Sequence, residues 1–233
     1  MRIISGSFKG KKILLPKDKL TRPLKDLTKE SIFNIIKHSK LLDVNIENSN
    51  ILDLFSGVGS FGLECLSRGA ENVTFIENYK EVLIVLKKNL ESLKKQNFSH
   101  ILEKDIFAKN TLEALNNKFD IIFMDPPYKE KKLVDLLDTI IKLKLLKNNG
   151  IIIIHRHKKE EDQFPNQFNL IMKKKYGISI LVLAHTPKRN LTQSLSINDL
   201  AGSKHLSNFA DSISAIGTST LDSKFRYIKQ III

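Results

Sequence analysis

The stretch "NILDLFSGVGSFGLECLSRGA", residues 50–70, decides the fold class. Its first six residues are apolar enough for a short buried strand, and Gly57, Gly59 and Gly62 follow closely. The residues after the turn are expected to form a helix that ends near Gly69. A strand, a glycine turn and a helix in this order are the opening unit of a parallel α/β sheet.

The alternation of strand and helix continues through the middle of the chain. Apolar runs predict further strands at residues 72–77, 99–105, 119–125, 150–156, 168–175 and 178–185, the last two as a hairpin. The pattern predicts helices at residues 80–96, 110–117 and 132–146. Strands of this kind predict an α/β fold, with a mostly parallel sheet and helices on both faces. Ligands bind such sheets at the carboxyl ends of the strands, near the point where the strand order reverses.

Acidic residues mark that edge of the predicted sheet. The glycine pattern matches a dinucleotide loop, but the carboxylate of Asp53 beneath the turn favours a ligand with a positively charged amino group. S-adenosylmethionine has such a group and no phosphate. Glu77 is placed to accept hydrogen bonds from ribose hydroxyls, and Asp105 to accept one from an adenine amine. We therefore expect S-adenosylmethionine to be bound by Asp53, Phe55, Gly57, Gly59, Glu77, Asp105 and Ile106.

A rigid corner, "DPPY", follows the strand predicted at residues 119–125. The exocyclic amine of a purine is a weak nucleophile, because its lone pair is delocalised into the ring. Hydrogen bonds to the Asp125 carboxylate and to the Pro126 carbonyl would hold such an amine in place, and the ring of Tyr128 would stack on the base. Catalysis would then come mainly from positioning. The expected catalytic residues are Asp125, Pro126, Pro127 and Tyr128.

The net charge of +13 favours a polyanionic partner, nucleic acid first. Residues 1–40 carry eleven lysines and arginines against three acids, so this segment is expected to face RNA or DNA. It is expected to form a hairpin followed by an amphipathic helix, with Ile32, Ile35 and Ile36 facing inward. The single cysteine, Cys65, excludes an internal disulfide framework and is interpreted as core filling. No apolar run approaches the roughly 20 residues of a membrane helix, and we expect a cytoplasmic protein.

Three stretches together resemble the RsmD family, bacterial enzymes that methylate N2 of a guanine in 16S ribosomal RNA. They are "TRPLKDLTKESIFNII", "ILDLFSGVGSFGLECLSRGA" and "FDIIFMDPPY", and the similarity spans residues 1–183. The last stretch contains the [D/N/S]-P-P-[Y/F/W] motif of amino-group methyltransferases. The resemblance implies a Rossmann-like class I methyltransferase fold with seven strands, the last antiparallel, and guanine held by Asp125 and Tyr128.

The resemblance also implies the partner. We expect a monomer that acts on 16S ribosomal RNA, in the small subunit or in an assembly intermediate of it. The residues expected to contact this RNA are Thr21, Arg22, Lys9, Lys11 and Lys12. No metal is expected in the site.

The chain departs from the family pattern in two places. After the fifth strand the family commonly has a glutamate, where this chain has His155-Arg156-His157; both histidines are expected at the surface. Residues 197–231 resemble the end of a RecA-like ATPase domain from mobile-element replication proteins, but the chain has no G-x-x-x-x-G-K-[ST] loop. We expect three parts: a basic segment 1–40, a methyltransferase core 41–185, and an atypical extension 186–233 that is either a fused or readthrough fragment or a poorly ordered segment.

Two alternatives stay open. The same corner serves enzymes that methylate adenine N6 or another amine of DNA or RNA. A nucleic-acid-binding protein with an inactive methyltransferase fold is the second alternative, and the acids at residues 53, 77, 105 and 125 argue against it.

Overall fold

The computed structural model describes residues 1–17, 24–127, 129–157, 164–175, 178–184, 213–218 and 226–231. Its helices are α1 (Asp26–His38), α2 (Ser60–Ser67), α3 (Lys80–Leu93), the short 3-10 helix η1 (Gln96–Phe98) and α4 (Leu133–Lys142). Its strands are β1 (Asn50–Leu54), β2 (Asn72–Ile76), β3 (Ser99–Leu102), β4 (Phe119–Met124), β5 (Leu146–His157), β6 (Asn169–Lys175), β7 (Ile178–Ala184), β8 (Ile213–Thr218) and β9 (Arg226–Ile231).

Seven strands form one sheet in the order β3-β2-β1-β4-β5-β7-β6. Strands β1 to β5 pair in parallel, and β7 is antiparallel to both β5 and β6. This confirms the mostly parallel sheet, the antiparallel last strand and the hairpin of β6 and β7. The strand order reverses between β1 and β4, where Leu54 pairs with Met124, so the turns that follow these two residues lie next to each other.

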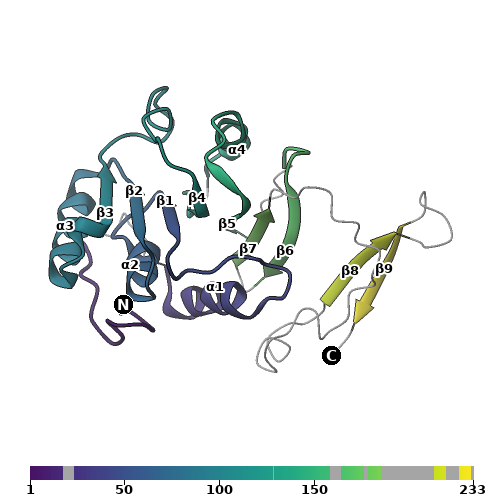
Figure 1. Ribbon diagram of the computed structural model, residues 1–233, viewed down its shortest axis with the longest axis horizontal. Helices are drawn as coiled ribbons and strands as arrows, with labels where there is room; N and C mark the ends of the chain where they lie inside the picture. The colour runs from purple at the N-terminus through teal and green to yellow at the C-terminus, as the bar shows by residue number, and fades with distance from the viewer. Residues whose placement is uncertain are drawn as a thin grey trace.

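Helices cover both faces of the sheet. Alternate residues of the central strands, such as Ile51 and Phe123, pack into one apolar cluster with α1, α2 and α3. The residues between them, such as Leu52 and Ile122, pack into a second cluster with α4 and the segment that follows β3. Figure 1 shows α4 above the sheet and α1 and α2 below it. The predicted three-layer fold is therefore confirmed.

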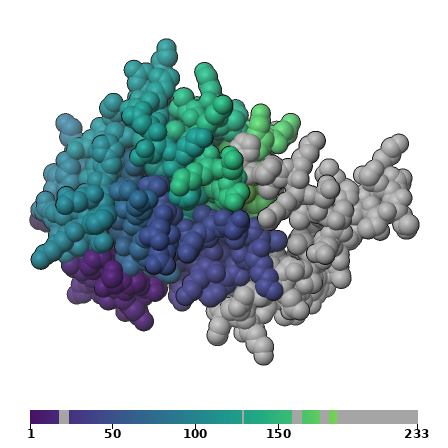
Figure 2. Space-filling view, in the orientation of Figure 1, coloured from purple at the N-terminus to yellow at the C-terminus, as the bar shows by residue number. Residues whose placement is uncertain are grey.

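The N-terminal segment packs against this core through Glu64 of α2. Arg2 and Lys12 form a single antiparallel bridge, and residues between them reverse the chain direction. The fully buried Glu64 carboxylate accepts the backbone N–H groups of Ile4 and Ser5, at 2.7 and 2.9 Å. It also lies 3.7 Å from the buried ammonium of Lys29. Lys29 is therefore buried in contacts that hold the N-terminal segment and does not contribute to a basic surface. Figure 2 shows the N-terminal segment in purple against the rest of the protein.

One predicted helix and one predicted strand end are wrong. Residues 110–117 form turns instead of a helix, and β3 ends at Leu102, before Asp105. The hydroxyl of Thr111 donates to the Asp105 carbonyl, at 2.6 Å, and the Thr111 N–H donates to the Ala108 carbonyl. These short-range hydrogen bonds compete with helical ones, which is why a threonine- and asparagine-containing segment of this length forms turns.

Three further expectations from the sequence concern the single cysteine, membrane helices and the C-terminal extension. Cys65 is buried in the core, and burial raises the pKa of its thiol well above the usual value, which fits core filling. None of the described helices is long and apolar enough to cross a membrane. In the extension, β8 and β9 form a separate antiparallel pair. Its resemblance to an ATPase fragment stays a prediction, and the other residues of 186–233 lie outside the described part of the chain.

Candidate active site

The glycine turn between β1 and α2 is built for close packing. Gly57 and Gly59 have left-handed φ angles of 55° and 82°. A Cβ on Gly59 would lie 2.4 Å from a methyl group of Leu86, and one on Gly62 would lie 2.3 Å from the ring of Phe75. The glycines therefore let α2 start close to β2 and α3, which points the N-terminal end of α2 at the carboxyl edge of the sheet.

Asp53 lies directly beneath this turn and is only 1% exposed. Its Oδ2 accepts the N–H of Gly62, at 3.0 Å. Burial raises the pKa of Asp53 well above the usual value; the Gly62 hydrogen bond lowers it in part, and the charges of Asp125 and Glu77 raise it further. No ion pair to Asp53 is found among the described residues. A buried acid without a cation, next to two other acids, is suited to a positively charged ligand.

Glu77 follows β2 and connects the glycine turn to the start of α3. Its carboxylate accepts the backbone N–H groups of Gly57, at 2.8 Å, Asn78, at 2.9 Å, and Tyr79, at 3.0 Å. These three hydrogen bonds fix the carboxylate at the carboxyl edge of the sheet, in the place predicted for a ribose-binding acid.

The turn after β3 brings aromatic and apolar groups to the same edge. The exposed Asp105 carboxylate accepts the N–H of Phe107, at 3.0 Å, and Ile106 is buried. The rings of Phe55 and Phe107 have centroids 5.9 Å apart. This arrangement offers the apolar contacts and the single acceptor that an adenine ring needs. The predicted cofactor residues from β1, β2 and this turn thus gather along one edge.

The acid–proline–proline corner follows β4 on the same edge. Asp125 has 22% of its side chain exposed, and its Oδ1 lies 2.8 Å from Nδ1 of His155. The carbonyl of Pro127 accepts the N–H of Glu130, at 2.9 Å, which closes a turn. Arg156 donates to the same Pro127 carbonyl, at 3.4 Å, and to the Glu130 carbonyl, at 2.5 Å. The corner is therefore held by β5 as well as by its own prolines.

The expectation of a surface position is wrong for His155, which is 5% exposed. Strand β5 extends through His157 and pairs with β7 up to that residue, while the corner that follows β4 contacts His155 and Arg156 from the other side. The signal was present in the sequence, because the apolar run "IIII" leads directly into these residues. Among the described residues, no group of three or more metal-binding side chains is close enough to hold an ion.

The three described lysines that are predicted to contact RNA do not lie at this corner. Thr21, Arg22 and Tyr128 lie outside the described residues. Lys9, Lys11 and Lys12 belong to the N-terminal hairpin, and the ammonium of Lys11 bonds to the backbone carbonyl of Ser92 near the end of α3. Helix α3 starts at the carboxyl edge of the sheet and ends at the amino edge, so these lysines lie toward the edge opposite Asp125.

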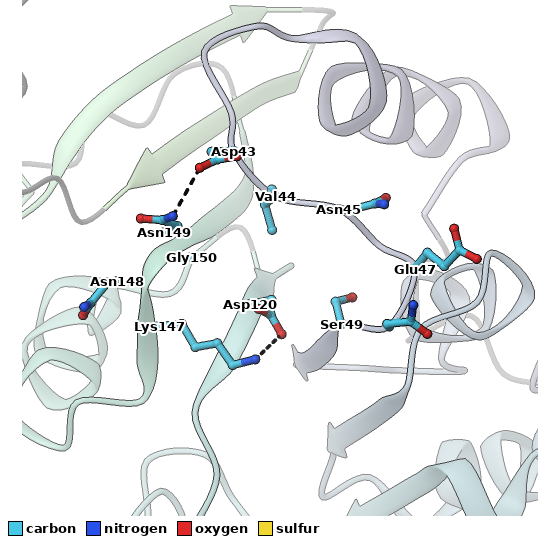
Figure 3. Close-up of a pocket in the computed structure, with 11 residues that line it drawn as sticks. Asp43, Val44, Asn45, Glu47, Ser49, Asp120, Lys147, Asn148, Asn149 and Gly150 are labelled. Carbon is cyan, nitrogen blue, oxygen red and sulfur yellow. Dashed lines mark hydrogen bonds and ion pairs between the residues drawn. The ribbon is translucent and has the colours of Figure 1, made fainter.

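A pocket of about 540 Å³ opens at that amino edge. It lies between the segment before β1 and the start of β5, with an ion pair of 2.8 Å between Lys147 and Asp120 and a 3.2 Å hydrogen bond from Asn149 to Asp43 (Figure 3). Because these residues precede or begin their strands, the pocket lies opposite the acids at the carboxyl edge. It is not the candidate active site.

A parallel sheet with a buried acid under a glycine turn and an acid–proline–proline corner beside it defines a Rossmann-like methyltransferase of the S-adenosylmethionine-dependent class. The family model "Conserved hypothetical protein 95" matches residues 1–185. The chain belongs to this family, which is the RsmD family identified from the sequence.

Relatives and solved structures with similar sequences agree with this assignment. The chain is 35% identical over 184 residues to "Putative rRNA methyltransferase YlbH" of Bacillus subtilis, which covers 77% of this chain and 95% of the relative. It is 36% identical over 179 residues to "Ribosomal RNA small subunit methyltransferase D" of Buchnera aphidicola, which covers 74% and 86%. Among structures, the putative methyltransferase yhhF of Escherichia coli has a TM-score of 0.68 at 26% identity, covering 81% of this chain and 99% of that one. The putative methylase HI0767 of Haemophilus influenzae has a TM-score of 0.64 at 30% identity, covering 80% and 98%.

Proposed function

We propose that the protein transfers a methyl group from S-adenosylmethionine to the exocyclic N2 amine of a guanine in 16S ribosomal RNA. The observation that carries the proposal is the position of Asp125, which follows β4 beside the end of β1 and is close enough to Asp53 to raise the pKa of that buried acid. The acid expected to hold the amine thus lies beside the acid expected to face the cofactor. Relatives named as small-subunit ribosomal RNA methyltransferases support the choice of RNA.

The charge of the site supports the cofactor. Asp53, Glu77 and Asp125 converge on one edge; burial raises the pKa of Asp53, and repulsion from Asp125 and Glu77 raises it further. S-adenosylmethionine supplies the methyl group and carries two positive charges, a sulfonium and an ammonium. A dinucleotide would instead bring a negatively charged pyrophosphate to the glycine turn beside these acids. Asp53 is the residue proposed to face the ammonium, and Glu77 the ribose.

Replacing Asp53 with asparagine is expected to stabilise the free protein more and more as the pH rises above about 4. The folded-state pKa lies above the unfolded value, so the unfolded chain ionises first and wild-type stability falls as the pH rises toward the folded pKa. Each unit of this shift is worth about 1.4 kcal/mol. Asparagine stays neutral and keeps an oxygen for the Gly62 N–H. Urea unfolding of both proteins at several pH values measures the difference; a constant difference across pH 4 to 8 contradicts the prediction.

The same variant separates stability from binding. Asparagine at position 53 is expected to weaken S-adenosylmethionine binding by about 10- to 100-fold, because the ammonium loses a buried charged partner. Burial raises the pKa of Asp53 in the free protein and a bound cation would lower it, so wild-type binding is expected to release a proton from Asp53 at pH values between the two; calorimetry in buffers of different ionisation enthalpy measures the release. The variant releases none from this position.

The corner supplies the chemistry of an amine acceptor. The Asp125 carboxylate and a backbone carbonyl accept the N–H groups of the amine and hold its lone pair toward the methyl group. Pro127 and Glu130 have their carbonyls bonded to Arg156, and no hydrogen bond to the Pro126 carbonyl is found among the described residues. The Pro126 carbonyl therefore fits the role of second acceptor. Stacking of the base on Tyr128 stays a prediction.

The basic residues favour a large RNA over a free nucleotide. The lysines of the N-terminal hairpin lie toward the amino edge of the sheet, while Asp125 lies at the carboxyl edge. A five-residue strand spans roughly 16 Å, so one ligand that contacts both edges must be a folded or extended polynucleotide. The roles of Lys9, Lys11, Lys12, Thr21 and Arg22 stay predictions, as do a monomeric state, a cytoplasmic location and the boundaries at residues 40 and 185.

Incubation with labelled S-adenosylmethionine tests the substrate class. We expect label in the 16S RNA of small subunits that lack the modification, and at most one tenth as much in large-subunit RNA or in duplex DNA. A comparison of naked 16S RNA with intact subunits shows whether ribosomal proteins contribute. Label that enters only DNA, or only adenine, favours the alternative amine methyltransferase and contradicts the proposal.

A further inference from the structure

Two adjacent residues of β5 hold the corner from opposite faces of the sheet. Nδ1 of His155 lies 2.8 Å from Oδ1 of Asp125, and Arg156 donates to the carbonyls of Pro127 and Glu130. We propose that His155 and Arg156 are positioning residues for methyl transfer: His155 fixes the Asp125 carboxylate, and Arg156 fixes the backbone of the corner. This inference rests on the proposed function and assigns roles that the corner motif alone does not contain.

The register of the sheet places the first contact. Strands β4 and β5 are parallel and pair Met124 with Ile154. Asp125 follows Met124, and His155 follows Ile154. The side chains of Asp125 and His155 therefore lie next to each other on the same face of the sheet. That face carries Asp53 as well, because Asp53 pairs with Phe123, two residues before Asp125. The imidazole and both acids therefore lie on one face of the sheet near its carboxyl edge, with Asp53 two residues behind Asp125 and His155.

The hydrogen bond leaves one oxygen of Asp125 for the substrate. An ionised carboxylate only accepts, so the proton of this bond belongs to Nδ1 of His155. With Oδ1 bonded to the imidazole, Oδ2 is the acceptor left for an amine N–H. The His155 side chain is 6% exposed and that of Asp125 is 22% exposed. The histidine thus lies behind the carboxylate, and the carboxylate faces the open side.

His155 is an unusual choice for a residue that only fills space. Its Nε2 is buried and has no hydrogen-bond partner among the residues that the structure describes. A buried polar atom without a partner lowers stability, so an apolar side chain of similar size would suit a purely structural role at least as well. If His155 only fills space, an apolar replacement should leave the rate of methyl transfer unchanged. If His155 positions Asp125, the same replacement should lower the rate without lowering stability.

Arg156 acts on the backbone that carries the second acceptor. The residue is 2% exposed, and its planar guanidinium reaches the carbonyls of Pro127 and Glu130 together. The Pro126 carbonyl lies between Asp125, which His155 holds, and Pro127, which Arg156 holds. Both groups expected to accept the amine are therefore fixed from β5. Lysine at position 156 would keep the charge but not the two-point contact.

Three variants test the positioning role. His155→Leu is expected to reduce kcat on small-subunit RNA by about 100-fold, with little change in the KM for RNA or in the Kd for S-adenosylmethionine. Its melting temperature is expected to equal or exceed that of wild type. His155→Asn places an amide N–H near the Nδ1 position and is expected to recover the rate to within about 10-fold of wild type. His100→Leu, which replaces an exposed histidine of β3, is the matched control and is expected to leave the rate unchanged.

A spectroscopic measurement on the free protein tests the contact between His155 and Asp125 independently of methyl transfer. In the free protein, the imidazole of His155 is expected to show a protected Nδ1–H in 15N-edited spectra, and this signal is lost in Asp125→Ala. A proton found on Nε2 alone overturns the inference. An active wild type with His155→Leu at full rate also overturns it and leaves the proposed function standing. A wild type that methylates no RNA overturns the proposed function, and with it the positioning role of His155 in methyl transfer, even with the Nδ1–H signal intact.

Discussion

Replacement of Asp125 by alanine is expected to reduce methyl transfer by about 10³-fold while S-adenosylmethionine still binds. The carboxylate follows β4, is held by His155 and keeps one oxygen toward the open side of the site. Without it, the substrate amine loses the acceptor that orients its lone pair. The cofactor residues belong to β1, β2 and the turn after β3, so their geometry is expected to persist. Single-turnover rates and calorimetric binding measure the two effects independently.

Two further variants show whether the loss is specific. Asp125→Asn keeps an oxygen for Nδ1 of His155 but has no charge, and we expect it to stay at least about 10²-fold below wild type. Asp138→Ala, an exposed acid of α4, is the matched control and is expected to transfer at the wild-type rate. A rate for Asp125→Ala within a few-fold of wild type would show that the corner does not hold the reacting amine.

Replacement of Glu64 by alanine is expected to lower the free energy of unfolding by about 3–5 kcal/mol. The fully buried Glu64 accepts N–H groups from the N-terminal segment and forms ion pairs with Lys29 and Arg68. Its removal leaves the buried Lys29 ammonium with the Asp26 carboxylate at 3.8 Å and the Arg2 carbonyl. Burial already lowers the pKa of Lys29, so the loss of its closer acid partner adds to an existing penalty.

Urea unfolding measures this change, with Glu91→Ala on the exposed face of α3 as the matched control. Adding Lys29→Met to Glu64→Ala removes the buried ammonium that has lost its buried acid partner and is expected to recover part of the stability, because the remaining contacts with Asp26 and the Arg2 carbonyl only partly offset its burial. A loss below about 1 kcal/mol for Glu64→Ala, as for a surface ion pair, would show that Glu64 does not fix the N-terminal segment.

The sheet and its helices could be predicted because their signals are local. Apolar strands alternating with helical patterns gave the correct layers, and the antiparallel last strand followed from the family resemblance. Residues 110–117 could not be assigned correctly, because the hydrogen bond from Thr111 to the Asp105 carbonyl forms only in the folded turn. The end of β3 depends on pairing with β2, which stops at Leu102.

Site residues could be predicted from the sequence where their position follows from the order of strands and turns alone. Asp53 was expected beneath the glycine turn of the first strand and Asp125 at the end of the fourth, and the pairing of β1 with β4 brings the two acids together. The contact of His155 with Asp125 could not be predicted, since it depends on the register between β4 and β5. The burial of Lys29 was equally hidden, because its partner Glu64 lies on another helix. Long-range partners of charged groups are therefore what the sequence pattern misses in this chain.

Nucleoside analysis of the methylated RNA tests the central claim most directly. Small subunits that lack the modification are incubated with the wild-type protein and isotopically labelled S-adenosylmethionine, and the 16S RNA is then digested to nucleosides and separated by mass. The proposed chemistry predicts labelled N2-methylguanosine as the product, and none with Asp125→Ala. Label in N6-methyladenosine, in a ring-nitrogen or carbon-methylated nucleoside, or an equal yield from Asp125→Ala, would contradict it.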